Sequence, residues 1–356
     1  MSHRIEETDS QVLFGEPAWH GLGNVLPEDS PARYDRVMAI KEAGLDWNVG
    51  LVPLNVAPVG SYVQGEGSDD VNDEPRILEV SSDIAGTTVS GTYGVHRQDT
   101  DSIIGVVGDR YRTLQNHEHF KFFDPFLSNG EAYFETAGSL MGGRIIWVLA
   151  RLNREDAVII PDSRDPDIVR KHLLLCSSHT GIIATSVKFT PTRVVCWNTL
   201  SAATSGEGDK LKIKHTQGQK EALSQVQDII NLADERFEAT ASQYRKLAQT
   251  AIDQEDLVNY VRKVFGHPTL SDEKAKGSHL STRAQNMVND VVQRAIEGIG
   301  QDRAPNTAWA AYNGVTEYIT HVHGNNQENR VRNQWFGDGM KVNDKALKMA
   351  LELVEA

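Results

Sequence analysis

The residues of this sequence that could do chemistry are mainly basic side chains interleaved with aromatic rings. The segment LKIKHT (211–216) alternates apolar and basic residues, so Lys210, Lys212 and Lys214 would project from one face of a strand. Ammonium groups two strand residues apart would be about 6.6 Å from one another, which is close to the phosphate repeat of an extended nucleic-acid strand. This pattern favours binding of a single-stranded nucleic acid.

Arginine and tryptophan residues in earlier segments extend the pattern. GRIIWVLAR (143–151) would place Arg144 and Arg151 on one strand with Trp147, although core packing is the favoured role of Trp147 itself. Basic groups beside aromatic rings are what sequence-tolerant binding of single strands requires. The predicted nucleic-acid-binding residues are Arg144, Arg151, Arg170, Lys171, Lys188, Arg193, Trp197, Lys210, Lys212 and Lys214.

Charge is distributed unevenly along the chain, whose net charge is -13. Residues 1–100 contain 17 acidic and 6 basic side chains, whereas residues 168–220 contain two acidic and eight basic ones. An anionic partner would therefore meet the middle segment. On charge alone, a solvated sheet face that binds no anionic partner is an equally good interpretation of this segment.

Glu317, His321 and His323 in TEYITHVH (316–323) are weak candidates for metal ligands. Glu317 and His321 would share one face of a helix at positions i and i+4. Histidines that neutralise the C-terminal end of a helix are a stronger explanation of this pattern. The acidic cluster DSRDPD (162–167) is more typical of a turn than of a cation site. We therefore predict no metal and no other cofactor.

Common catalytic patterns are missing from the sequence. It contains no GxxxxGK[ST], HExxH, CxxC or GxSxG motif and no EF-hand loop, so we predict no catalytic residues and favour a non-catalytic role. Cys176 and Cys196 lie in the apolar runs LLLC and VVCW, where a small buried side chain is commoner than a reactive thiolate. Two cysteines, no signal peptide and no apolar run of about 18 to 20 residues favour a reducing, cytoplasmic setting.

The elements that would position these residues are strands in the first part of the chain. Short segments rich in β-branched residues and separated by turn residues predict antiparallel strands. A hairpin is predicted around MGG (141–143), a second strand pair around SHTG (178–181), and a short helix at 116–127. The predicted strands are 45–56, 76–80, 87–96, 102–107, 132–140, 144–152, 172–177 and 182–189.

The pattern changes near residue 215. From Thr216 onward, apolar residues recur at spacings of three and four, which predicts an amphipathic helix roughly 50 Å long with Thr216 and Gln219 as a capping box. Further helices are predicted at 253–265, 281–299, 305–322 and 341–355. We expect an α+β chain with a sheet-rich domain at 1–215, which includes the acidic N-terminal region and the basic segment 168–220, and a helical region at 216–356.

The segment FTPTRVVCWNTL (189–200) is ambiguous between strand and helix. Thr190 followed by Pro191 is a good N-cap and first-turn pair, so we predict a helix that begins there. Arg193 would then lie one turn before Trp197 on a mostly apolar face, where an unpaired guanidinium is costly. Arg193 must stack on Trp197, pair with a carboxylate, or reach a phosphate group of a ligand.

Several segments together resemble a known family. PAWHGLG (17–23), ETAGSLMGGRIIWVLARL (135–152), LLLCSSHTG (173–181), TRVVCWNTL (192–200) and NTAWAAYNGVTEYITH (306–321) resemble the phage and plasmid-like proteins known as domain of unknown function 932. The resemblance implies an origin in a phage, prophage or plasmid and a setting in the cytoplasm of a bacterial host. It supplies no catalytic residues for transfer to this chain.

The expected architecture is also similar in outline to the single-strand annealing proteins of phages, the RecT, Redβ and Erf types. That similarity implies oligomers that hold single-stranded DNA in a basic groove and pair it with its complement without ATP. It is an analogy of fold, and fold does not dictate function.

Three hypotheses about function follow. The first is an ATP-independent protein that binds and anneals single-stranded DNA in recombination and forms a homo-oligomer. The second is a non-catalytic phage protein whose acidic N-terminal 100 residues bind a basic host protein. The third is a nucleic-acid enzyme that uses a metal near His321 and His323.

Overall fold

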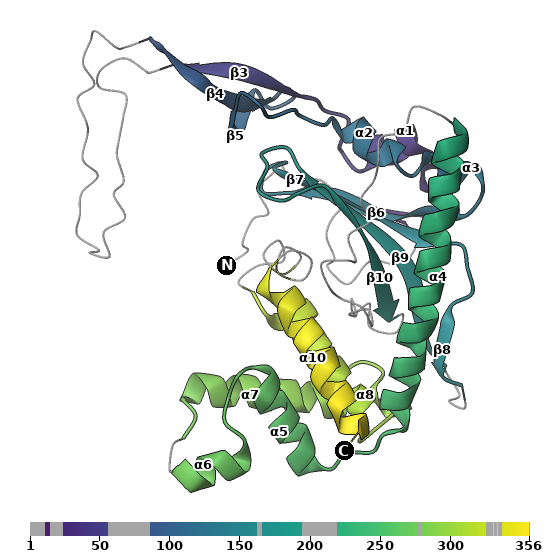
Figure 1. Ribbon diagram of the computed structural model, residues 1–356, viewed down its shortest axis with the longest axis vertical. Coiled ribbons are helices and arrows are strands. Elements are labelled where there is room, and N and C mark those ends of the chain that lie inside the picture. Colours follow the sequence, from purple (N-terminus) through teal and green to yellow (C-terminus); the bar gives the residue numbers. More distant parts are fainter. Residues whose placement is uncertain are drawn as a thin grey trace.

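The computed structural model describes residues 11–14, 24–55, 86–161, 166–193, 219–276, 279–324, 330, 333 and 337–355. Figure 1 shows two antiparallel sheets from the first part of the chain and a group of helices from the second part. This arrangement confirms the predicted α+β class. Within the described ranges, no helix is both long and apolar enough to cross a membrane.

The main sheet has the strand order β10-β9-β7-β6-β1-β2, and β8 pairs with β9 beside this path. The β1–β2 pair is parallel and all other pairs are antiparallel. The strands are β1 (Gln11–Phe14), β2 (Asn24–Leu26), β6 (Ala132–Leu140), β7 (Ile145–Leu152), β8 (Ala157–Ile160), β9 (Asp167–Ser178) and β10 (Ser186–Arg193). The predicted hairpin and the second strand pair are therefore confirmed.

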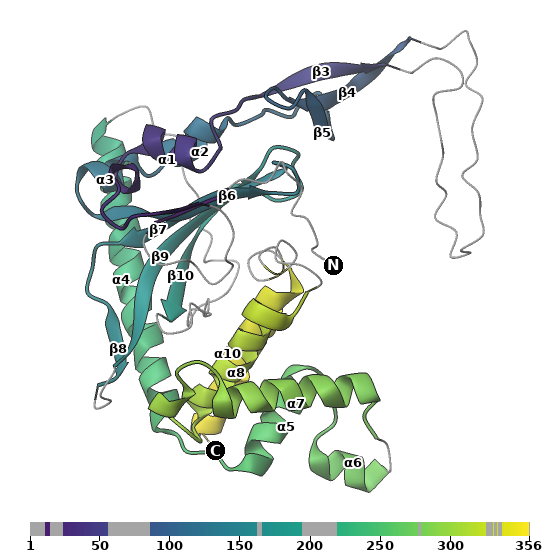
Figure 2. The same cartoon turned by 180° about the vertical axis from the view of Figure 1, so that it is seen from behind.

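A smaller antiparallel sheet has the order β3 (Val49–Asn55), β4 (Thr88–Arg97) and β5 (Ser102–Gly108). It projects beyond the main sheet in both views (Figures 1 and 2). Trp47, which precedes β3, contacts the last residue of β4: the guanidinium of Arg97 lies 4.1 Å from the centroid of the Trp47 ring. The predicted strands at 45–56, 87–96 and 102–107 correspond to these three elements, and the prediction at 76–80 lies outside the described residues.

The two faces of the main sheet pack differently, because side chains alternate between them along each strand. The face that we call the first face is covered by α1 (Arg36–Glu42), α2 (Asn116–Lys121) and α3 (Asp124–Ser128), with Phe120 and Phe123 packed on Phe134. The opposite face, the second face, lies on the side of α10 (Figure 2). Its apolar part consists of Leu140, Ile145, Trp147, Leu149, Leu174 and Cys176.

The helical part begins with the long helix α4 (Gln219–Gln249), as predicted. Its other members are α5 (Gln254–Val264), α6 (Leu270–Lys276), α7 (Thr282–Glu297), α8 (Ala308–Glu317), which continues as a π-helical turn over Tyr318–Val322, and α10 (Asp338–Glu355). Trp309 and Tyr312 of α8 are fully buried against Tyr244 of α4. The sequence missed α1 and α6, and the predicted helix at 116–127 is divided into α2 and α3.

One prediction of local structure was wrong. Thr190 and Pro191 do not begin a helix, because β10 continues through both residues to Arg193 and pairs with β9 in register, Pro191 opposite Lys171. β10 is an edge strand of the main sheet, and an edge position tolerates a proline that cannot donate to a ladder. The rest of the predicted helix and the proposed boundary near residue 215 lie outside the described residues.

Candidate nucleic-acid interface

The second face of the main sheet becomes polar toward one end of its strands. Directly opposite residues of antiparallel strands point to the same face. Four polar residues lie opposite one another across four neighbouring strands and form what we call the polar row: Tyr133 of β6, Arg151 of β7, His172 of β9 and Thr190 of β10. A sequence position alone does not predict this row, because it depends on the register of three separate strand pairs.

Two further basic residues flank the polar row on the same face. Arg170 pairs with Thr192 two residues before His172 on β9, and Lys188 pairs with Leu174 two residues after it. The Nζ of Lys188 donates to the Sδ of Met340 in α10 at 3.4 Å. The interface therefore extends over β7, β9 and β10 toward the N-terminal end of α10.

Tyr133 is held at the edge of the row by Arg33. The Arg33 guanidinium lies 4.2 Å from the Tyr133 ring centroid, and its Nη2 donates to Glu135 at 3.2 Å. Glu135 lies at a β-bulge between Phe134 and Thr136, where a strand can turn one side chain out of the regular alternation. Burial raises the pKa of Glu135 above its ordinary value, although Arg33 and Arg151 act in the opposite direction.

Asp156 lies in the connection between β7 and β8, accepts a hydrogen bond from Arg151 and forms a longer ion pair with Arg170. Its Oδ2 is 2.9 Å from Nη2 of Arg151 and 3.7 Å from Nε of Arg170. The other carboxylate oxygen, Oδ1, is buried and has no hydrogen-bond partner. All three side chains remain partly exposed, at 17% for Arg151, 25% for Arg170 and 22% for Asp156.

His172 is the fully buried member of the polar row. Neither of its ring nitrogens has a side-chain hydrogen-bond partner. Burial, together with the neighbouring Arg151 and Arg170, lowers the pKa of His172 to about 3, although a backbone hydrogen bond with Arg170 acts in the opposite direction. The imidazole is therefore neutral at physiological pH.

The charges of the interface leave it slightly basic. Four cationic side chains (Arg33, Arg151, Arg170 and Lys188) face three carboxylates (Glu28, Glu135 and Asp156), and His172 is neutral. Cationic groups on one sheet face can bind an anionic chain by neutralising its phosphates.

Two of the predicted binding residues, Lys171 and Arg144, lie away from the polar row. Lys171 points to the first face, where its Nζ lies 2.7 Å from Asp234 of α4 and 4.5 Å from the ring centroid of Phe237. Arg144 is exposed in the turn before β7, at the opposite end of that strand from Arg151. Trp147 is fully buried in the second-face core, as favoured for it, so its ring offers no open surface for stacking.

Arg193 pairs with a carboxylate, which is one of the three interactions expected for its side chain. Its Nε is 2.9 Å from both carboxylate oxygens of Asp167, its Nη2 is 2.6 Å from Oδ2, and both side chains are fully buried. The same Nη2 donates to the carbonyl of Gly300, and the indole N–H of Trp309 donates to Asp167. These contacts give Arg193 a structural role, and its assignment to the binding site stays a prediction.

The remaining predicted binding residues, Trp197, Lys210, Lys212 and Lys214, lie outside the described residues, as does Cys196. So do eleven of the seventeen acidic residues of segment 1–100. The hypothesis of an acidic surface for a host protein therefore stays a prediction.

The metal candidates do not assemble into a site. Glu317 accepts Nη1 of Arg294 at 3.0 Å and the backbone N–H of Ile299 at 3.2 Å, so both of its carboxylate oxygens are engaged. Burial raises the pKa of Glu317 even though Arg294 acts in the opposite direction. Glu317, His321 and His323 do not belong to any group of three potential ligands within metal-binding reach in the described part of the chain.

Cys176 has the core position that the sequence indicated. It is fully buried in the second-face core with Trp147 and Leu174. Burial raises the pKa of the Cys176 thiol far above its ordinary value, so the thiolate needed for nucleophilic attack is disfavoured.

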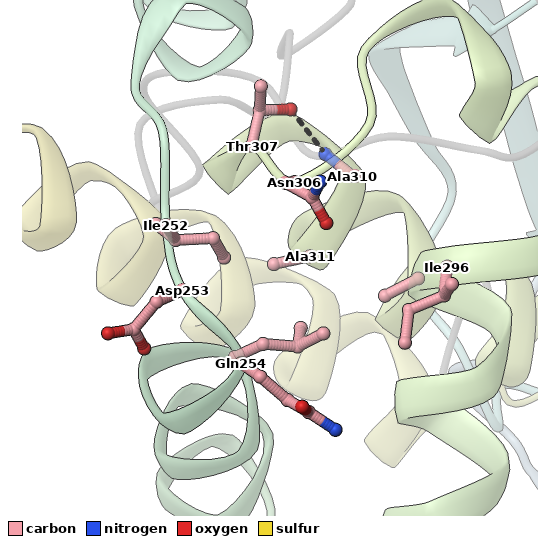
Figure 3. Close-up of a pocket in the computed structure, with 10 residues that line it drawn as sticks. Ile252, Asp253, Gln254, Ile296, Asn306, Thr307, Ala310 and Ala311 are labelled. Atoms are coloured by element: carbon pink, nitrogen blue, oxygen red, sulfur yellow. Dashed lines mark hydrogen bonds between the residues drawn. The ribbon is translucent and has the colours of Figure 1, made fainter.

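A small pocket of about 190 Å³ lies in the helical part, where the start of α5, the end of α7 and the start of α8 meet (Figure 3). Its walls include Ile252, Ile296 and Ala311. The Asp253 carboxylate and the Thr307 hydroxyl cap α5 and α8 by accepting backbone N–H groups. These polar groups complete helix ends, and we assign no chemistry to this pocket.

Comparison with known families gives one match. The family model described as Domain of unknown function (DUF932) matches residues 103–346, which include β6, β7, β9, β10 and the whole polar row. No curated protein and no solved structure matches the chain.

Proposed function

We propose that this chain, which belongs to the family described as Domain of unknown function (DUF932), binds single-stranded DNA on the second face of its main sheet. The observation that best supports the proposal is the polar row with its basic flanks. Arg151, Arg170 and Lys188 come from three neighbouring strands and point to one face. Neighbouring strands lie about 4.8 Å apart, so these cations can follow the backbone of an extended strand.

Burial and pairing determine which part of this face meets the DNA. The guanidinium groups of Arg151 and Arg170 are partly exposed and share one carboxylate, whereas His172 is buried beside them. Phosphate contacts by such groups position a strand without reading its sequence. We therefore expect binding that tolerates many base sequences.

The proposal includes annealing of complementary strands without ATP, in a homo-oligomer that serves recombination of phage or plasmid DNA inside a bacterial host. The missing nucleotide-binding motif and the resemblance to phage annealing proteins support this part. Light scattering coupled to size exclusion, with and without single-stranded DNA, measures assembly. Mixing complementary labelled strands with the protein measures annealing.

Gel-shift titration of the chain with a labelled single-stranded oligonucleotide tests the binding itself. Each phosphate contact on a single strand contributes a salt slope of about -0.7, so three contacts predict roughly a twentyfold loss of affinity between about 50 and 200 mM salt. Absence of a shifted band at low salt would refute the proposal.

A further inference from the structure

We propose that Arg151 and Arg170 form a subsite for one phosphate group, and that Asp156 occupies this subsite until a phosphate displaces it. The inference rests on the proposed function for the identity of the anion, a phosphodiester of single-stranded DNA. The geometry of the subsite requires only an oxyanion of that size and charge.

Asp156 uses only one of its two carboxylate oxygens to contact the two arginines. A single oxygen, Oδ2, faces both guanidinium groups, while the buried Oδ1 has no hydrogen-bond partner. An unpaired buried oxygen is costly, and a carboxylate offers only two oxygens. A phosphate group offers several oxygens to two arginines, and arginine–phosphate hydrogen bonds are charge-assisted and frequently bidentate.

The position of Asp156 allows it to leave. It lies in residues 153–156, between the last residue of β7 and the first residue of β8. Arg151 and Arg170 belong instead to paired strands of the sheet. The two arginines are therefore fixed by the sheet, whereas the competing carboxylate is on a connection.

His172 lies beside the proposed subsite and can report on it. It lies between Arg151 and Thr190 in the polar row and two residues from Arg170 on the same strand. Neither nitrogen of this buried ring has a side-chain hydrogen-bond partner, and its polar contact is with the backbone of Arg170. An oxyanion bound by the neighbouring arginines would bring a negative charge close to the ring.

A second carboxylate supplies a matched control. Asp234 of α4 also receives two basic groups, Nζ of Lys171 at 2.7 Å and Nε of Arg154 at 3.7 Å, which repeat the distances around Asp156 closely. Lys171 points to the first face, so this pair is on the side of the sheet opposite the polar row. Each of the two Asp234 oxygens has its own partner, unlike those of Asp156.

The test compares Asp156→Asn with Asp234→Asn in the full chain, by fluorescence anisotropy of a labelled single-stranded oligonucleotide. Asp156→Asn should tighten binding by about three- to tenfold, because the competing ion pair of this partly exposed site is weakened. Asp234→Asn should leave the affinity within about twofold of the wild type.

A second measurement uses inorganic phosphate as the probe and the wild-type chain with ¹⁵N-labelled histidine. The ring signals of His172, assigned with His172→Asn, should shift on addition of phosphate and should do so at lower phosphate concentration in Asp156→Asn. A phosphate response without any DNA binding would support the subsite and refute the proposed function. DNA binding that is unchanged or weaker in Asp156→Asn, together with unmoved His172 signals, would overturn the subsite and leave the proposed function standing.

Discussion

Arg193 and Asp167 form a fully buried ion pair that joins the main sheet to the helical part. Arg193 ends β10 and Asp167 begins β9, and the pair also receives the Trp309 indole N–H and contacts the carbonyl of Gly300. The guanidinium of Arg193 therefore has its hydrogen-bond and charge partners within the protein. The pair explains why an arginine is found at a fully buried position.

Loss of this pair should destabilise the fold without changing the binding surface. Arg193→Ala leaves the Asp167 carboxylate buried and uncompensated, and removal of one partner from such a pair costs about 3 to 5 kcal/mol of unfolding free energy. Urea denaturation measures this loss.

The matched control is Arg144→Ala, because Arg144 is exposed and should change the unfolding free energy by less than about 0.5 kcal/mol. Reduced DNA affinity of Arg193→Ala at an unchanged melting temperature would instead return Arg193 to the binding site.

Acid should destabilise the fold through three buried histidines. Burial lowers the pKa of His119 and His172 to about 3 and that of His179 to about 4. The unfolded chain takes up these protons near pH 6.5, whereas the folded chain resists them, so stability is complete above pH 6.5 and falls as the pH drops toward 4. Each histidine contributes up to about 1.4 kcal/mol per pH unit in this window.

Urea midpoints measured between pH 7 and pH 5 check this dependence. His119→Leu removes an imidazole that has no hydrogen-bond partner and should flatten the pH dependence. The core variant Leu149→Ala should lower stability by about 2 to 5 kcal/mol at both pH values. An equally steep pH dependence in His119→Leu would exclude His119 as one of its sources.

Glu317 should stabilise the helical part through Arg294. Glu317→Gln removes the negative charge from a nearly buried side chain that accepts Nη1 of Arg294 and the N–H of Ile299. We expect a loss of about 1.5 to 3 kcal/mol in unfolding free energy, the usual contribution of a hydrogen bond to a charged group. A stability that depends on added divalent metal, and that Glu317→Gln makes independent of it, would favour the ligand role instead.

Local patterns predicted the regular elements of this fold. The two strand-like segments 132–140 and 144–152 on either side of the MGG turn predicted the β6–β7 hairpin, and the three-and-four spacing after residue 216 predicted α4. The strand at Thr190 and Pro191 was missed, because the local capping signal was overridden by pairing with β9. Such tertiary pairing is not visible in a single segment.

The candidate site was predictable only in part for the same reason. Arg151, Arg170 and Lys188 were identified by residue type, but Arg193 and Lys171 share that type and point into internal ion pairs. His172, Thr190 and Asp156 were missed because their positions follow from strand register and from a connection between strands. The alternation of β9 around His172 was the available signal, since it places Arg170 and Leu174 on the same face.

The proposed location of the DNA on the second face can be tested directly. Fluorescence anisotropy of a labelled single-stranded oligonucleotide across a salt series should give a lower affinity for Arg151→Gln and Arg170→Gln. Each variant should also lose about 0.7 from the salt slope, the contribution of one phosphate contact. Arg283→Gln, an exposed arginine of α7 in the helical part, should retain the wild-type affinity and slope. Equal slopes for all four proteins would contradict binding on the second face.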